Sequence, residues 1–211
     1  IVSDLYAVFH SDWKFAAKEE LARPSETSIV LEHHDPVALQ LVPSGPDVDD
    51  DSMYDTIITS LFTAQKRIWI VTPYFIPDEV LLKALCIAAK RRVDVRIVVP
   101  QVSNHRLADI VRRSYLRQIQ DAGAKICQFT PGMVHGKVIL IDDSLGIIGS
   151  MNMDIRSFFL NYEIALFIDS EGVIPVLDNW IRDLMEQCTM GEKKVSGMVE
   201  FFEGIGRLFA P

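Results

Sequence analysis

The sequence predicts an α/β layered fold with a mixed central sheet flanked by helices. Short apolar runs rich in Val and Ile alternate with amphipathic segments of helical length. Turn and cap residues separate many of these segments, and the last apolar runs follow one another too closely for helices between all of them. The 211 residues, of which 49% are hydrophobic and 24% charged, fit one compact domain.

The first half of the chain predicts three helices and three strands. Acidic caps in the stretch DVDDDSMYD mark the start of the second helix, and prolines end the buried second strand. The Val- and Ile-rich third strand has the composition typical of β-structure. The expected helices are 2–17, 50–65 and 78–91, and the expected strands are Val37–Val42, Arg67–Thr72 and Val93–Val99.

The second half begins with a basic helix over 104–121, and Gly123 follows its end as glycine often does. Three apolar strands come next, and a short helical turn at 154–158 separates them from a fourth. A helix at 173–187 closes the domain. The four expected strands are 124–129, 137–142, 145–150 and 162–168.

The residues suited to chemistry are concentrated in HGKVILID and in the GSMN run that follows it. The imidazole of His135 can attack phosphorus or protonate a leaving oxygen. The ammonium of Lys137 and the amide of Asn152 can neutralise charge on non-bridging phosphate oxygens, and Ser150 adds a further donor. This set predicts a site that holds and attacks a phosphodiester.

Strand periodicity orders these side chains, because residues i and i+2 of a strand share a face. His135 and Lys137 are therefore expected to point the same way. Asp142 has the opposite parity, so we expect a structural or supporting role for it and not that of general base. Glu163, on the apolar run YEIALFI, is expected to hold the imidazole N–H and fix its tautomer.

The pattern H-x-K-x(4)-D followed by G-S-x-N resembles the second signature motif of the phospholipase D superfamily. The likeness covers nearly the whole chain, and the run TPYFIPDE points to the C-terminal half of bacterial cardiolipin synthases. It is carried, outside the motif, by Pro43–Asp47, Trp69–Glu79, Arg113–Tyr115, Arg156–Phe158 and Asn161–Glu163.

The resemblance implies a phospholipase D-like fold and a phosphatidyl transfer that makes cardiolipin and glycerol from two phosphatidylglycerols. It implies a phosphatidyl-histidine intermediate and neither metal nor cofactor. His135 would act as general acid/base opposite a nucleophilic histidine from a first motif. The candidate catalytic residues are His135, Lys137, Asp142 and Glu163, and the candidate phosphate-binding residues are Lys137, Ser150 and Asn152.

Only one such motif occurs in this sequence, so we expect half of an active site. The other half would come from a first-motif segment of the same enzyme or from a second copy in a homodimer. The start of the chain echoes its closing helix, which indicates a duplicated precursor. We therefore expect residues 1–25 to be the tail of a preceding half, 26–190 to be the phospholipase D-like domain, and 191–211 to be an amphipathic segment.

Two other functions stay open on the sequence alone. Water in place of a lipid alcohol would make the protein a hydrolase of lipid or nucleic acid phosphodiesters, and a lone half-site would make it a catalytically incomplete domain. Net charge is −8, which argues against broad nucleic-acid binding. The basic excess falls in residues 61–150, where 13 basic residues face 7 acidic ones and an anionic lipid would be steered.

Location and pocket lining complete the expectations. The first residues lack the basic start of a signal peptide, and no apolar run spans a bilayer. We expect a bacterial membrane protein, peripheral or anchored through segments absent from this sequence. Residues 195–209 could lie on the bilayer or pack against protein.

Tyr74, Phe75 and Ile76 could line a glycerol or acyl pocket. Cys86 and Cys127 are expected to be reduced core residues rather than zinc ligands.

Overall fold

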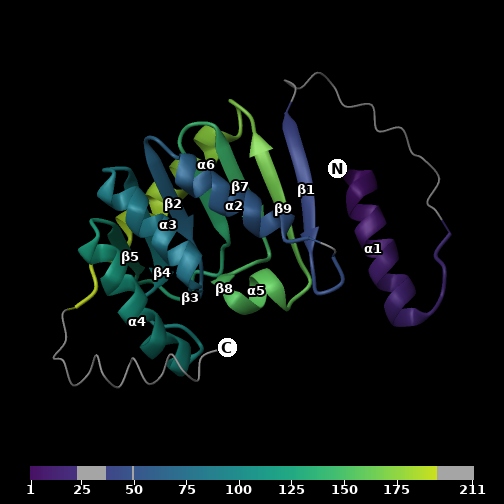
Figure 1. Ribbon diagram of the computed structural model, residues 1–211, viewed down its shortest axis with the longest axis horizontal. Helices are drawn as coiled ribbons and strands as arrows, with labels where there is room; N and C mark the ends of the chain where they lie inside the picture. Colours follow the sequence, from purple (N-terminus) through teal and green to yellow (C-terminus); the bar gives the residue numbers. More distant parts are fainter. Residues whose placement is uncertain (23–36, 49, 194–211) are drawn as a thin grey trace.

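A computed structural model of the chain describes residues 1–22, 37–48 and 50–193 (Figure 1). Its central element is an eight-stranded sheet with the strand order β1-β9-β7-β6-β2-β4-β5-β10. The bounds of these strands are β1 Ala38–Ser44, β2 Arg67–Val71, β4 Asp94–Pro100, β5 Lys125–Phe129, β6 Val138–Ile141, β7 Leu145–Gly149, β9 Glu163–Asp169 and β10 Cys188–Met190.

The sheet is mixed, as the sequence predicts. Strands β2, β4 and β5 run parallel because a helix crosses back after β2 and after β4. Strands β6 and β7 are joined by a tight turn and pair antiparallel, as do β7 and β9. The edge strands are also antiparallel to their neighbours: β1 pairs with β9, and β10 pairs with β5. Strand β6 also pairs antiparallel with β2, which joins the two halves of the sheet.

Helices cover both faces of this sheet (Figure 1). Helices α2 (Ser52–Thr63), α3 (Glu79–Lys90) and α4 (Arg106–Asp121) lie on one face, and α6 (Ile174–Glu186) lies on the other. Each helix buries its apolar side against the strands, for example through Leu85 of α3 and Ile181 of α6, both fully buried. The result is a three-layer α/β/α arrangement with one hydrophobic cluster on each side of the sheet.

The helices expected from the sequence are found within a few residues of their predicted bounds, including α1 (Val2–Ala17) and the short α5 (Ile155–Phe159). Helix α1 lies beside β1 and has no buried residue (Figure 1). The predicted amphipathic segment 195–209 lies outside the described residues. Among the described residues, the longest helices are too short or too polar to cross a bilayer.

Three short strands were not expected from the sequence. Strands β3 (Phe75–Ile76) and β8 (Met153–Asp154) pair in parallel as a second, two-stranded sheet, and β10 extends the edge of the main sheet. Segments of two or three residues are too short to show a hydrophobic period. The β3–β8 pair matters for function because it fixes the loop after β2 beside the GSMN run.

Candidate functional site

The candidate site lies at one end of the central strands of the main sheet, where β2 and β7 end and β6 and β9 begin. His135 and Lys137 precede β6, and Ser150 and Asn152 follow β7. The two segments meet because β6 and β7 are antiparallel neighbours: the N–H of Gly149 donates to the carbonyl of Lys137 at 3.1 Å. The GSMN run is thereby held beside the histidine and the lysine.

His135 and Lys137 form a close pair. The ammonium Nζ lies 3.0 Å from Nδ1 and 3.4 Å from Nε2 of the imidazole. It also donates to the carbonyl oxygen of His135 at 3.0 Å. The expectation that the two side chains lie on the same side is confirmed, although both residues precede the regular strand. The imidazole is exposed, so a substrate phosphate can reach it.

Ser150 and Glu163 connect the GSMN run to β9. The hydroxyl of Ser150 donates to one carboxylate oxygen of Glu163, and Asn161 Nδ2 donates to the other at 3.2 Å. The backbone N–H of Ile164 donates to Ser150 Oγ at 3.0 Å. Sequence reasoning expected Glu163 to hold the imidazole, but its hydrogen-bond donors among the described residues are Ser150 and Asn161. The carboxylate instead fixes Ser150.

Burial and the nearby charges act on the pKa of Lys137 in opposite directions. Burial is the largest influence and lowers the pKa of Lys137, while the negative charges of Glu163 and Asp154 raise it in part. The net pKa lies below the usual lysine value. The two carboxylates therefore help to keep the ammonium charged beside His135, which is the form that can neutralise a phosphate oxygen.

Replacing Glu163 by glutamine should lower the pKa of Lys137 further, because it removes a negative charge that favours the ammonium. A titration of the lysine side chain by NMR, with Nζ or Cε labelled, measures this directly. The substitution of Glu171, which is exposed and is not among the charges acting on Lys137, serves as the control. A Lys137 titration that does not move in Glu163→Gln would contradict the electrostatic link.

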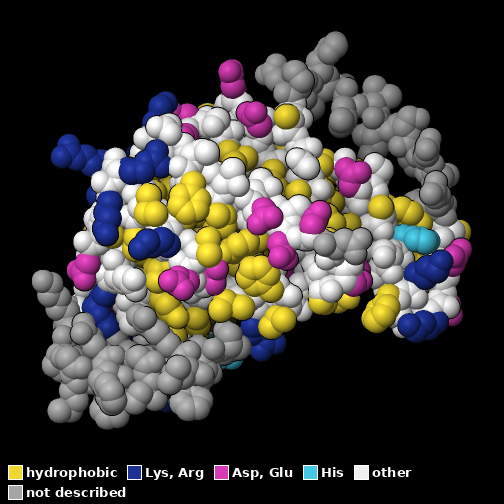
Figure 2. Space-filling view, viewed as in Figure 1, with side chains coloured by type: hydrophobic (Ala, Val, Ile, Leu, Met, Phe, Trp, Pro, Cys, Tyr) yellow, Lys and Arg dark blue, Asp and Glu magenta, His cyan; other side chains and the backbone are white. Residues whose placement is uncertain are grey.

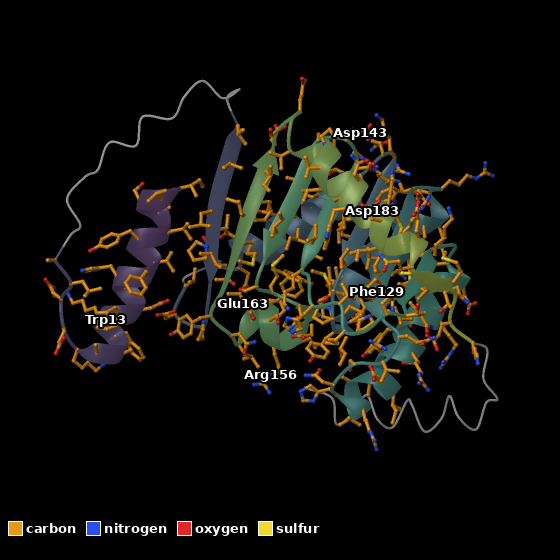
Figure 3. All side chains as sticks on the ribbon, turned by 180° about the vertical axis from the view of Figure 1, so that it is seen from behind. Trp13, Phe129, Asp143, Arg156, Glu163 and Asp183 are labelled. Carbon is orange, nitrogen blue, oxygen red and sulfur yellow. The ribbon has the colours of Figure 1, made fainter. Side chains whose placement is uncertain are left out.

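Asp142 lies at the opposite end of the central strands, where β6 ends and β2 begins. Its carboxylate accepts from the backbone N–H groups of Gln65 (3.0 Å), Lys66 (2.7 Å) and Arg67 (3.0 Å). Figure 3 labels the neighbouring Asp143 at one end of the sheet and Glu163 at the other. These contacts agree with the structural role expected from parity, and the place of Asp142 among the catalytic candidates stays a prediction.

Gly149 is the one position in the motif where any side chain would collide with backbone. A Cβ atom there would stand 2.6 Å from the carbonyl oxygen of Ile164 and 2.6 Å from the sulfur of Met151. The glycine allows β7 to approach β9 closely enough for the N–H of Ser150 to donate to the same carbonyl at 2.9 Å. The spacing of Ser150 and Asn152 from Lys137 depends on this contact.

Gly149→Ala is expected to lower the free energy of unfolding by about 1–3 kcal/mol, the usual range for overpacking a close contact. Chemical denaturation of the chain gives the value. Gly132→Ala is the matched control, because a Cβ at Gly132 meets no atom within 4 Å. Equal effects of the two substitutions would show that the close approach at Gly149 is not required.

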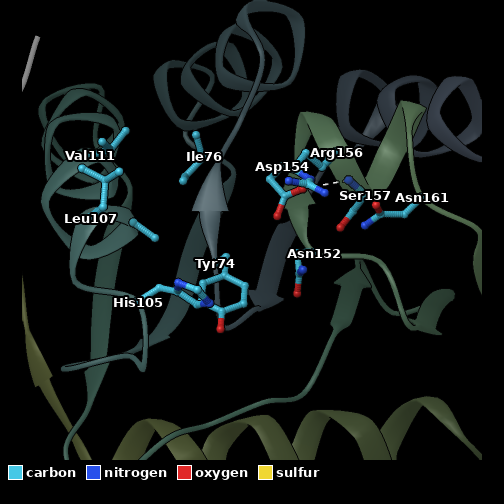
Figure 4. Close-up of a pocket in the computed structure, with 11 residues that line it drawn as sticks. Tyr74, Ile76, His105, Leu107, Val111, Asn152, Asp154, Arg156, Ser157 and Asn161 are labelled. Atoms are coloured by element: carbon cyan, nitrogen blue, oxygen red, sulfur yellow. Dashed lines mark hydrogen bonds between the residues drawn. The ribbon is translucent and has the colours of Figure 1, made fainter. Parts of the chain in front are cut away.

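A cavity of about 470 Å³ adjoins the motif (Figure 4). Tyr74 stands between it and the histidine, with its ring centroid 6.4 Å from that of His135 and 5.7 Å from that of His105. Tyr74 and Ile76 line the cavity, as expected, but Phe75 is fully buried in the core, so its predicted place in the lining is wrong. Alternation along β3 turns Phe75 inward.

Sequence reasoning missed the residues that α4 and α5 bring to this cavity. His105 and Leu107 come from the start of α4, and Arg156 and Ser157 come from α5. Helix α4 is distant from the motif in sequence, and only the parallel crossovers place it beside the GSMN run. Arg156 and Ser157 follow that run closely, but no sequence pattern indicated that they face a cavity. Among the described residues, no group of three or more His, Cys, Asp or Glu side chains is placed to hold a metal ion.

Comparison with known proteins agrees with this geometry. Residues 57–185 match the family model described as "Cardiolipin synthase, PLD-like domain". A cardiolipin synthase of Halalkalibacterium halodurans is 37% identical over 185 residues, 87% of this chain and 37% of that protein. One from a Geobacillus strain is 33% identical over 217 residues, 100% of this chain and 43% of that protein. The chain thus spans less than half the length of these relatives.

Solved structures with the same fold include the phospholipase D family member Nuc from Salmonella typhimurium, with a TM-score of 0.63 at 23% identity over 75% of this chain and 100% of that one. Phosphatidylserine synthase from Haemophilus influenzae gives a TM-score of 0.64 at 16% identity over 85% of this chain and 46% of that one. The mixed three-layer fold, the site and the family match lead to one conclusion: the chain belongs to the phospholipase D-like domains of the cardiolipin synthase family.

Proposed function

We propose that this chain supplies the second half of the active site of a phosphatidyltransferase that makes cardiolipin and glycerol from two phosphatidylglycerols. The observation that carries the proposal is the His135–Lys137 pair, held at one end of the central strands beside Ser150 and Asn152 in a cardiolipin synthase-like domain. No cofactor is invoked, because a nucleophile, a general acid and cationic stabilisation of the phosphate suffice for the transfer.

The proposed transfer proceeds in two steps. An imidazole nitrogen attacks the phosphorus of the first phosphatidylglycerol, a P–N bond forms, and the P–O bond to the headgroup glycerol breaks. The opposing imidazole, which we assign to His135, gives its proton to the leaving glycerol oxygen. The hydroxyl of a second phosphatidylglycerol then returns a proton to His135 and attacks phosphorus, and the P–N bond breaks to release cardiolipin.

Lys137 and Asn152 act on the phosphate rather than on the proton. Their donors face the negative charge that the transition state concentrates on the non-bridging oxygens. Ser150, held by Glu163, fixes the start of the GSMN run on β9 and so positions Asn152. The same electrostatics would serve a hydrolase, and water in place of the second lipid is therefore the main competing reaction.

The second histidine of this scheme would come from a first-motif half of the same enzyme or from a second copy of the chain. The exposure of His135 fits either arrangement, because a partner imidazole and a substrate must both reach it. A closed two-fold pairing would bring two His-Lys pairs together. The substrate places the working protein at a bacterial membrane surface, with no nucleic acid as partner. The basic side chains over α3 and α4 in Figure 2 fit an anionic lipid.

The test is product analysis of phosphatidylglycerol micelles incubated with the 211-residue chain, with molar mass measured in parallel. Cardiolipin and glycerol in equal amounts support the transferase. Glycerol with phosphatidic acid would indicate a hydrolase instead of a transferase, and cleavage of DNA without lipid turnover would indicate a nuclease. A folded monomer without any product would show a catalytically incomplete half-domain. His10→Ala, a substitution in α1 outside the motif and outside the cavity of Figure 4, is the control for sample preparation.

A further inference from the structure

The cavity beside the motif has two unlike walls (Figure 4). One wall is apolar and comes from Ile76 and from Leu107 and Val111 of α4. The facing wall is polar and includes Asn152 and Ser157. A volume of about 470 Å³ exceeds what one or two waters need and is in the range of small-ligand pockets. The cavity therefore has the size and the two-sided character of a binding site.

Two polar atoms on this wall are buried without a hydrogen-bond partner. They are Oδ1 of Asn152 and Oγ of Ser157, and the Ser157 residue has 0% exposure. Buried polar atoms are nearly always satisfied, because each unsatisfied one destabilises the fold. The Ser157 backbone N–H, by contrast, is satisfied by the Asp154 carboxylate at 2.8 Å. The unpaired side-chain atoms in the cavity wall are those that a ligand would complete.

The chemistry of the walls excludes two parts of a phospholipid. An acyl chain would cover the Asn152 and Ser157 oxygens without pairing them, which is unfavourable. A phosphodiester inside the cavity would leave Asn152 Oδ1 unpaired, because both groups only accept hydrogen bonds. Of the two charged residues in the lining, Asp154 would repel it and Arg156 would attract it. Neutral hydroxyl groups fit, because each hydroxyl both donates and accepts while its carbon atoms lie against an apolar surface.

We propose that this cavity is a subsite for the vicinal hydroxyls of a glycerol headgroup, next to the phosphate at Lys137, with Ser157 and Asn152 as its hydrogen-bonding residues. The inference rests on the proposed function and specifies which lipid the site prefers. Asn152 belongs to both parts: its amide nitrogen is expected at the phosphate, and its oxygen faces the headgroup. Tyr74, between the cavity and His135, makes the two parts continuous.

The test compares two water-soluble phosphodiesters that differ only in these hydroxyls. Glyceryl methyl phosphate carries the vicinal diol, and methyl propyl phosphate carries the same phosphodiester without it. Each is titrated into the 211-residue chain by NMR or calorimetry, which needs no turnover. The diol is expected to bind about tenfold more tightly, the effect of one or two neutral hydrogen bonds.

Ser157→Ala should reduce this preference to about threefold or less, because one partner of the diol is lost. Ser170→Ala is the matched control, since Ser170 is also a buried serine but lies in the turn before α6. Its preference should equal that of the unchanged chain. Saturation-transfer signals from the glycerol protons should be stronger than those from the methyl group.

Each outcome separates this inference from the proposed function. Equal affinities of the unchanged chain for the two diesters, or no binding of either, would overturn the subsite whether or not cardiolipin is formed. A full preference retained in Ser157→Ala would overturn the assignment of Ser157. A tenfold preference that depends on Ser157, in a chain that yields phosphatidic acid instead of cardiolipin, would support the subsite and overturn the transferase.

Discussion

Replacing His135 by alanine is expected to lower phosphatidylglycerol turnover by at least three orders of magnitude while leaving the fold intact. The imidazole supplies either the nucleophile or the proton of the leaving glycerol, and alanine can do neither. Its side chain is exposed and contacts Lys137 and the Tyr74 ring, so few packing contacts are lost. Surface substitutions of this kind usually change stability by less than about 0.5 kcal/mol.

The measurement is glycerol release from phosphatidylglycerol micelles by the assembled site, with the free energy of unfolding determined on the same samples. A change in kcat with little change in KM is expected, because the imidazole acts in the transition state. His105→Ala is an informative companion, since the His105 ring also contacts Tyr74 and His105 lines the cavity. It should alter KM more than kcat. Turnover of His135→Ala within tenfold of the original would remove His135 from the mechanism.

Strand parity explains how much of the site could be predicted from the sequence. The period of two placed His135 and Lys137 together and turned Asp142 away, and the contacts agree on both points. Parity does not say which neighbour satisfies a carboxylate. Glu163 was assigned to the imidazole, but Ser150 and Asn161 donate to its carboxylate. Strand β9, which carries Glu163, pairs directly with β7 and not with β6.

The cavity was beyond sequence reasoning because its walls meet only in three dimensions. Tyr74 could be placed past the end of a strand, where ligands bind in open α/β sheets. Leu107 and Ser157 are separated in the chain by the four strands β5 to β8, and the short β3–β8 pairing that sets their spacing carries no periodic signal. The fold class depended on long repeating patterns and was predictable; the cavity depends on single contacts and was not.

The second large effect concerns stability. Asp142→Ala is expected to lower the free energy of unfolding by about 2–4 kcal/mol, because three backbone N–H groups at the start of β2 lose a charged acceptor. Alanine also fits poorly at the φ of 52° that Asp142 adopts, which Asp and Asn tolerate better. Asp142→Asn keeps this backbone preference and one acceptor oxygen, so it should cost less than Asp142→Ala.

Asp143→Ala is the matched control for this prediction. Asp143 is the next residue and also carries a charge, but its own side chain is exposed in both of its ion pairs, with Lys66 at 2.5 Å and with Arg67 at 3.0 Å. Exposed pairs contribute about 0–1 kcal/mol, so a small effect is expected. Denaturant unfolding of the variants gives the values, and equal losses at Asp142 and Asp143 would contradict the capping role.

The pH dependence of stability provides an independent check on Asp142. Burial acts to raise the pKa of Asp142, but the N–H groups of Arg67, Gln65 and Lys66 together outweigh it, and the net pKa lies below the usual value for aspartate. A carboxyl whose pKa is lower in the folded state stabilises the fold above its unfolded pKa. That contribution is lost as the pH falls through the folded pKa. The unchanged chain should therefore lose stability below about pH 4 more steeply than Asp142→Asn, which has no charge to titrate at this position. Parallel pH profiles for the two proteins would show that the three hydrogen bonds do not depend on the charge of Asp142.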